Sequence, residues 1–201
     1  IFEFNNPSTI GNMPLMSKIT NIFFHSVTPR TAGFNTLPTE SMRETSQLLM
    51  LLLMFVGGAP GSTAGGLKIT TFSIMILSVV SYIRGHENLN VMERRIGEGV
   101  QKRALSILVI SIAVVSLTTM VLLANNDGSF MQVVFESFSA FGTVGLSTGI
   151  TPDLSTLSKL QIILTMFLGR VGPLSFAVSL SMRQNSKNTA YKYPEGKITV
   201  G

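Results

Sequence analysis

The sequence predicts an all-α membrane protein made of helix–pore loop–helix repeats, in which the second helix of each repeat is broken. Three observations support this fold class. Only 12% of the 201 residues are charged, about half of the roughly 25% usual in soluble domains. Residues 104–124 form an uninterrupted apolar stretch. Two similar strings, Thr-Ala-Gly-Phe-Asn-Thr at 31–36 and Thr-Val-Gly-Leu-Ser-Thr at 143–148, each follow a short Phe- and Ser-containing stretch.

The composition argues against several classes of function. The chain has no cysteine and only two histidines, so a thiolate metal site is impossible and a histidine site is poorly supplied. The formal net charge is +5, but the basic clusters lack the interleaved aromatic residues of single-strand binders, and no nucleic-acid partner is predicted. No carboxylate pair or nucleophile–base arrangement stands out, so we expect neither an enzyme nor a covalent cofactor.

Two short helices are expected over residues 18–28 and 130–140. Each is too short to span a bilayer, which requires about 20 residues, so both are expected to enter from the outer side as re-entrant pore helices. Their C-terminal ends carry partial negative charge and point toward the strings, which favours a cation there. Gly33 and Gly145 can adopt the positive φ that turns backbone oxygens toward an ion.

Residues 45–82 are expected to form a broken helix. As one straight helix they would be about 57 Å long, too long for a hydrocarbon core of about 30 Å. The middle of this stretch is rich in glycine and cannot stay helical; it consists of Gly57, Gly58, Ala59, Pro60, Gly61, Ser62, Thr63, Ala64, Gly65 and Gly66. Irregular backbone at membrane depth must be buried in protein or line a water-filled cavity, so the break indicates a conduit rather than an anchor.

The second repeat is complete. Residues 104–124 match a spanning helix, and residues 157–182 form a second broken helix with its break at residues 169–173. Arg170 in this break lies near the middle of the membrane, where a charge needs a partner; loop carbonyls or the hydroxyls of Ser62 and Thr63 are the expected partners.

Charge predicts orientation and organisation. The basic residues of 82–103 and of the tail after Met182 place both segments in the cytoplasm, with the strings on the outer side of a multi-pass protein of the plasma (inner) membrane. Residues 1–84 are expected to form a pore unit without its first helix, 85–103 a cytoplasmic linker, 104–183 a complete pore unit and 184–201 a cytoplasmic tail. The chain is expected to be the C-terminal part of a longer one.

Three strings in this order carry a family resemblance: residues 28–36, the loop 57–66 with Leu67-Lys68 after it, and Gly-Arg-Val-Gly-Pro at 169–173. Together they resemble the Trk/Ktr/HKT superfamily of potassium transporters, and most closely the membrane subunits of bacterial Ktr systems. The resemblance covers essentially the whole chain. It implies a potassium-channel-like fold with four pore units in one chain, of which this sequence supplies the last two pore loops.

The resemblance also implies roles for individual residues. The transported K⁺ would be bound at Thr31, Gly33, Thr143 and Gly145, by a selectivity filter whose backbone carbonyls come from Thr31, Ala32, Gly33, Phe34, Thr143, Val144, Gly145 and Leu146. The loop 57–66 would be the gate beneath the filter, and Arg170 would face it. Implied partners are the N-terminal half of the same pore, a second copy in a homodimer, membrane lipid and a cytosolic nucleotide-binding regulatory ring of the RCK type. Whether Na⁺ also takes part is left open.

Several alternatives stay open at this stage. A secondary active cation symporter with discontinuous helices would also explain the breaks, although not the two repeated strings. The loop 57–66 could be a close helix-packing motif. It is not a phosphate-binding loop, because Leu67 separates the last glycine from Lys68. The roles of Arg30, Glu136 and Lys68 are undecided: each could support the filter or gate, or be an ordinary polar residue.

Overall fold

The computed structural model describes residues 2–85, 89–91, 94–126 and 128–172. Within these ranges the regular secondary structure is almost entirely helical, which confirms the all-α prediction. The elements in order are α1 (Leu15–Val27), η1 (Thr39–Ser41), α2 (Glu44–Phe55), α3 (Ile69–Ile83), β1 (Asn90–Val91), β2 (Arg94–Arg95), α4 (Glu98–Asn125), α5 (Phe130–Gly142), η2 (Thr151–Asp153) and α6 (Thr156–Val171). The predicted second half of the last broken helix and the tail 184–201 lie outside the described residues.

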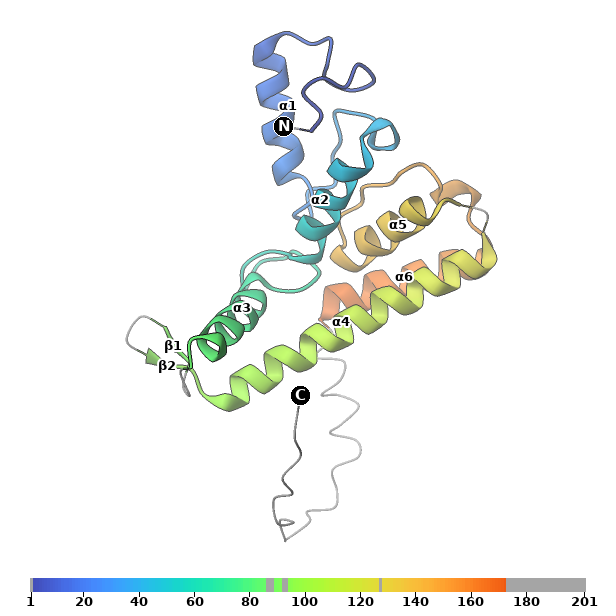
Figure 1. Cartoon of the computed structure of the whole chain (residues 1–201). Helices are drawn as coiled ribbons and strands as arrows, with labels where there is room; N and C mark the ends of the chain where they lie inside the picture. Colours follow the sequence, from blue (N-terminus) through green and yellow to red (C-terminus); the bar gives the residue numbers. More distant parts are fainter. Residues whose placement is uncertain (1, 86–88, 92–93, 127, 173–201) are drawn as a thin grey trace.

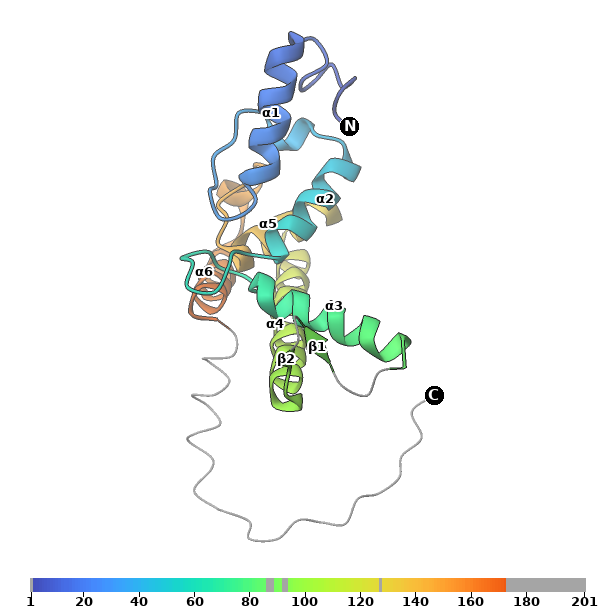
Figure 2. The same cartoon turned by 90° about the vertical axis from the view of Figure 1, so that its left-hand side faces the viewer.

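The helices are arranged around α4, which is by far the longest (Figure 1). Helices α5 and α6 pack against α4 and against each other, and α2 packs on α5. Helix α3 packs on α4 as well, nearer its N-terminal end. In both views α1 stands at one end of the molecule, apart from α4 (Figures 1 and 2). The two short helices that precede the strings are therefore α1 and α5, close to the predicted bounds.

Helix α4 is the one helix of the described residues that is long and apolar enough to cross a membrane. Its 28 residues correspond to about 42 Å, and it begins at Glu98 rather than at the predicted Ala104. The earlier start has a local reason, because Glu98 and Lys102 lie one turn apart with 3.9 Å between their charged groups, a spacing that supports a helix. The linker before it is correspondingly shorter and holds the unpredicted hairpin of β1 and β2.

The predicted break between α2 and α3 is confirmed. The chain leaves the helix at Val56, and Val56 pairs with Leu67 in an isolated parallel bridge. The Gly57 amide donates to the Leu67 carbonyl at 2.8 Å, and the Leu67 amide donates to the Phe55 carbonyl at 3.1 Å. These bonds close the loop at its neck, so backbone groups that lost their helical partners are satisfied there.

The predicted break at residues 169–173 is confirmed only at Gly172, and its first three residues, Gly169, Arg170 and Val171, are helical. All three residues remain in α6, and the helix ends at Gly172, whose φ is +89°. Gly169 does not end the helix; it gives room, because a Cβ there would collide with the carbonyl of Phe141. Glycine is therefore required at position 169, but the reason is the close approach of two backbones and not the end of a helix.

The core contains a polar seam as well as apolar clusters. Leu122, Val133 and Ile162 belong to an apolar cluster shared by α4, α5 and α6. Between α4 and α6, the hydroxyls of Thr118 and Thr165 are 2.7 Å apart. Such interhelical hydrogen bonds supplement packing where lipid offers no hydrophobic drive for helix association. The seam fixes α6 against α4 and thereby positions its C-terminal end, which carries Arg170.

Candidate functional site

The two Thr-x-Gly strings share an unusual backbone conformation. Thr31 and Thr143 have φ of +68° and +50°, and they are the only non-glycine residues with positive φ in the part of the chain that the structure describes. Gly33 and Gly145, two positions later, have φ of +76° and +92°. A β-branched residue in the left-handed region is a genuine outlier, and such strain persists only where the surroundings enforce it. The sequence similarity therefore corresponds to a repeated backbone structure.

The amides at the start of both strings are held by the pore helices. The Ala32 amide donates to the Thr28 carbonyl at 3.1 Å, and the Val144 amide donates to the Ser139 carbonyl at 2.9 Å. Because these N–H groups point back to the helix ends, the carbonyl groups of the strings point away from the helix ends. Phe34 differs, since its carbonyl accepts a hydrogen bond of 2.5 Å from the Thr28 hydroxyl.

The structure brings the two strings together. The Thr31 hydroxyl donates to the Gly142 carbonyl at 3.1 Å. A Cβ on Gly33 would collide with the carbonyl oxygen of Val144, and a Cβ on Gly145 would lie 3.8 Å from the Cα of Gly33. The Val144 carbonyl thus faces the first string. Gly33 is required both for its positive φ and because this carbonyl occupies the space of a side chain.

The remaining string residues divide between the core and the surface. The side chains of Val144 and Leu146 are buried in the core cluster beside α2. Ala32 and Phe34 are exposed. The second string is thus anchored by its own side chains, whereas the first presents its side chains outward.

Each string is braced by polar side chains of its own pore helix. Glu136 of α5 is 5% exposed, and its carboxylate accepts hydrogen bonds from the Ser147 hydroxyl, from the Thr148 amide at 3.0 Å and from the Thr151 hydroxyl at 3.0 Å. A buried carboxylate needs such partners. The structure therefore assigns Glu136, whose role was open, to the support of the second string.

On α1, Asn21 and His25 act on the first string. The Thr36 hydroxyl donates to Asn21 Oδ1 at 2.6 Å and lies 3.3 Å from His25 Nε2. Sequence reasoning missed this pair. The only signal in the sequence was two polar residues four apart, which places them on one face of the helix; it was weak, because α1 carries four further polar residues.

The glycine-rich loop has an exposed tip and a buried base. Residues 59–63 are exposed, and residues 64–67 are buried. The Arg170 guanidinium donates to the Thr63 carbonyl, which confirms the expected carbonyl partner. Lys68 Nζ donates to the carbonyls of Ser62 at 3.1 Å and Ala64 at 2.6 Å. Two cations thus hold the tip, and Lys68 is assigned to the loop.

Arg30 is placed differently from Arg170. Its side chain is exposed, and it forms no side-chain hydrogen bond or ion pair with other described residues. No described hydrogen bond or ion pair assigns the Arg30 side chain to the first string that it precedes, so its role stays undecided.

Outside the strings, Glu3 ties the segment before α1 to the start of α2. Its carboxylate accepts from the Arg43 amide at 2.8 Å and from the hydroxyls of Ser46 at 2.6 Å and Thr9 at 2.7 Å, and from Asn6 Nδ2 at 2.6 Å. Burial raises the pKa of Glu3, but hydrogen bonds from Ser46, Thr9, Asn6 and Arg43 outweigh it and leave the pKa below 4.5. The charged carboxylate at the N-terminus of α2 also suits the helix dipole.

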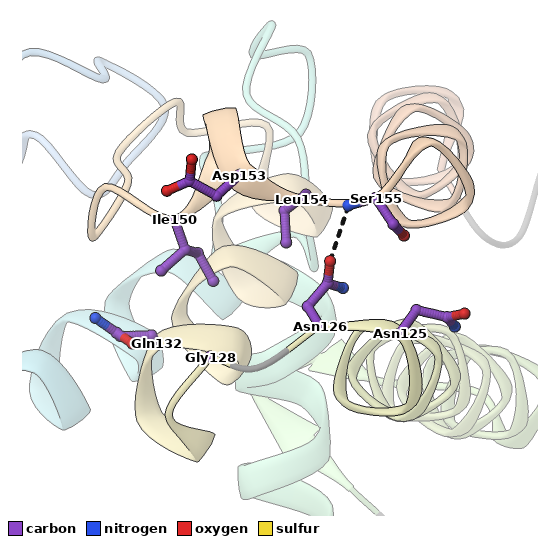
Figure 3. Close-up of a pocket in the computed structure, with 8 residues that line it drawn as sticks. All are labelled: Asn125, Asn126, Gly128, Gln132, Ile150, Asp153, Leu154 and Ser155. Carbon is purple, nitrogen blue, oxygen red and sulfur yellow. Dashed lines mark hydrogen bonds between the residues drawn. The ribbon is translucent and has the colours of Figure 1, made fainter.

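A separate cavity of about 440 Å³ lies where α4 ends and α5 and α6 begin (Figure 3). Asn126 joins these elements: its Oδ1 accepts from the Ser155 amide at 2.8 Å, and its Nδ2 donates to Ser158 Oγ at 2.7 Å. The lining mixes polar and apolar residues and does not include the strings; it consists of Asn125, Asn126, Gly128, Gln132, Ile150, Asp153, Leu154 and Ser155. In the described residues no group of three or more His, Cys, Asp or Glu could hold a metal ion.

Comparison with known proteins agrees with this geometry. Residues 2–191 match the family TrkH, described as a cation transport protein. The chain is 43% identical over 201 residues to the Ktr system potassium uptake protein B of Bacillus subtilis (strain 168), covering 100% of this chain and 44% of that protein. It is 37% identical over 200 residues to the potassium/sodium uptake protein NtpJ of Enterococcus hirae, covering 98% of this chain and 44% of that protein.

The fold is also shared with a solved structure. The potassium transporter TrkH from Vibrio parahaemolyticus superimposes with a TM-score of 0.72 at 17% identity, over 89% of this chain and 40% of that one. At this identity the match shows the fold alone. The chain spans less than half the length of the relatives that it matches. By its family match and its identity to these relatives, the chain belongs to the TrkH family of cation transport proteins.

Proposed function

We propose that this chain supplies two of the four quarters of a channel-like pore for potassium uptake across the plasma membrane. The observation that carries the proposal is the repeated conformation of the two strings, with Thr and Gly in the left-handed region at matching positions. A potassium filter replaces the hydration shell of the ion with backbone carbonyls. Two chain segments with the same strained backbone, lying side by side, are what a pore of repeated units requires.

In this proposal the ion-binding oxygens are carbonyls of Thr31, Ala32, Gly33, Thr143, Val144 and Gly145. Amides at the start of both strings point back to the pore helices, so these carbonyls are free to face an ion. The C-terminal ends of α1 and α5 add partial negative charge. Phe34 contributes less, because its carbonyl already accepts from Thr28. Leu146 supports the filter through its buried side chain.

The glycine-rich loop would be the gate. Its exposed tip, residues 59–63, is attached mainly through Arg170 and Lys68, and these hydrogen bonds can be broken without unfolding a helix. The positive charge of Arg170 beside the conduction path would also repel K⁺ while the tip is closed. Release of the tip would then remove both the loop that blocks the conduction path and the electrostatic repulsion between Arg170 and K⁺.

The rest of the assembly follows from the resemblance. The other two quarters would come from an N-terminal half of the same pore, and α1, which has no buried residue, offers an apolar surface for it. A homodimer and a cytosolic nucleotide-binding ring would complete the system, with the basic linker and the C-terminus in the cytoplasm. The name of the relative NtpJ includes sodium, so Na⁺ is the competing ion to test.

The test is ion flux through the full-length protein containing this chain, reconstituted in liposomes, with K⁺ and Na⁺ measured separately. We expect K⁺ to pass in preference to Na⁺, and we expect Gly33→Ser and Gly145→Ser to reduce this preference. Gly99→Ser is the matched control, since a Cβ at Gly99 meets nothing within 4 Å. Equal passage of both ions through the unaltered protein would contradict the potassium assignment. Uptake that requires an Na⁺ gradient would favour the symporter.

A further inference from the structure

Four glycines from three segments of the chain meet beneath the second string. Gly65 and Gly66 come from the base of the loop, Gly142 ends α5, and Gly169 lies in α6; all four are buried. The Gly66 amide donates to the Gly169 carbonyl at 3.2 Å. A Cβ on Gly142 would lie 2.7 Å from the Met54 carbonyl oxygen. The backbones are therefore in direct contact, and the loop base, the helix end and α6 form one packed unit.

Gly65 is the member of this unit that contacts the filter string. A Cβ on Gly65 would collide with the Thr143 hydroxyl oxygen, and it would lie 2.8 Å from Thr143 Cγ2 and 2.9 Å from the Gly142 carbonyl oxygen. Gly65 is not among the residues with positive φ. Its φ could thus accommodate an alanine, and glycine is required there because the Thr143 side chain and, less closely, the Gly142 carbonyl oxygen fill the space of a Cβ.

Thr143 depends on this contact for its position. Its φ of +50° is strained for a β-branched residue, so neighbouring atoms must hold it there. Its backbone amide donates to the Ala140 carbonyl at 3.1 Å, but its buried hydroxyl has no hydrogen-bond partner among the described residues. The side chain is consequently held by packing, and Gly65 forms the surface beneath it.

The loop base cannot move independently of the string. The neck bonds of Gly57 and Leu67 and the bond from Gly66 to Gly169 anchor the base, whereas the tip is anchored only by side chains. We propose that Gly65 is a positioning residue for ion specificity: it holds Thr143 in its left-handed conformation, so that the buried base of the loop determines which ion passes while the exposed tip determines how fast. This inference rests on the filter and gate proposed above.

The test compares Gly65→Ala with Gly58→Ala in the full-length protein in liposomes, at matched protein abundance. A Cβ on Gly58 would crowd only the loop's own Ser62 and Ala64 side chains. We expect Gly65→Ala to lower the ratio of K⁺ to Na⁺ passage several-fold, whereas any effect of Gly58→Ala should be confined to total flux. In a Thr143→Ala background, Gly65→Ala should have a much smaller further effect on the ratio, because the two nearest colliding atoms, the Thr143 hydroxyl oxygen and Cγ2, are gone and only the Gly142 carbonyl oxygen remains close.

If Gly65→Ala does not reach the membrane, Thr143→Ser provides the second measurement. It keeps the backbone and the hydroxyl but deletes Cγ2, which packs on Gly65, so the ratio should fall. An unchanged ratio in Gly65→Ala, or in Thr143→Ser where that variant is used, would overturn the positioning role and leave the proposed pore intact. Absence of selective K⁺ passage in the unaltered protein would instead overturn the proposed function.

Discussion

The hydroxyls of Thr118 on α4 and Thr165 on α6 lie 2.7 Å apart, and both side chains are fully buried. The Thr165 hydroxyl also donates to the Gln161 carbonyl of its own helix at 2.8 Å. The Thr118 hydroxyl also accepts a hydrogen bond from Gln161 Nε2 at 3.2 Å. In a membrane such a network joins two helices that hydrophobic burial does not hold together. The same two helices carry the spanning segment and Arg170.

Thr118→Val should therefore loosen α6 on α4. Valine has nearly the same shape but no hydroxyl, and a loss of about 1 kcal/mol of unfolding free energy is expected. Thr119→Val is the matched control, because its hydroxyl bonds only to the Val115 carbonyl of its own helix. Unfolding in detergent followed by circular dichroism measures both. Equal destabilisation by the two variants would contradict a role for the interhelical bond.

Glu136→Gln should weaken the support of the second string. Glutamine keeps the length of the side chain, but its amide nitrogen cannot accept a hydrogen bond, so at least one of the three donors loses its partner. A hydrogen bond to a charged group contributes about 1.5–3 kcal/mol to folding stability, whereas a hydrogen bond between neutral groups contributes about 1 kcal/mol. We expect a lower ratio of K⁺ to Na⁺ passage in liposomes. Glu98→Gln, an exposed carboxylate on α4, is the control, and equal ratios in the two variants would contradict the brace.

Arg170→Ala should raise ion flux or loosen its regulation. The substitution removes the donor to the Thr63 carbonyl and a positive charge beside the proposed path. Lys68→Ala removes the bonds to Ser62 and Ala64 and should free the tip in the same way, with a smaller effect on the electrostatic barrier. Initial rates of K⁺ uptake at equal abundance measure both. Unchanged transport and regulation in Arg170→Ala would refute its role in the gate.

Glu3 should make the start of α2 sensitive to acid. Its pKa in the folded protein is below the ordinary value of 4.5, so the folded state binds its proton less readily than the unfolded state. The resulting stability is present above pH 4.5 and is lost as pH falls through the folded value. The protection of the amides of residues 43–47 against hydrogen exchange, measured relative to the intrinsic exchange rate at each pH, should fall on acidification, and Glu3→Gln should show low protection already at neutral pH. An exchange rate in Glu3→Gln equal to that of the unaltered protein at neutral pH would contradict this account.

The sequence by itself determined the class and order of the elements. A long stretch without charged residues identified α4, and glycine and proline located the break after α2. The repeated strings located both pore helices. These features can be predicted because they depend on local backbone preference and on the thickness of the bilayer. The brace by Asn21 and His25 was not predictable, since it requires knowing which side of α1 faces the string.

Only the tertiary structure decided what each glycine is for. Gly169 was expected to break a helix, and instead it makes room for the Phe141 carbonyl. In the sequence Gly65 is one of several loop glycines, and only the structure shows that the Thr143 side chain packs against it. Glycine has two physical uses, positive φ and the absence of a Cβ. The first is a local property that a sequence pattern can indicate, whereas the second depends on atoms more than 70 residues away along the chain for Gly65 and Thr143, which only the folded backbone brings together.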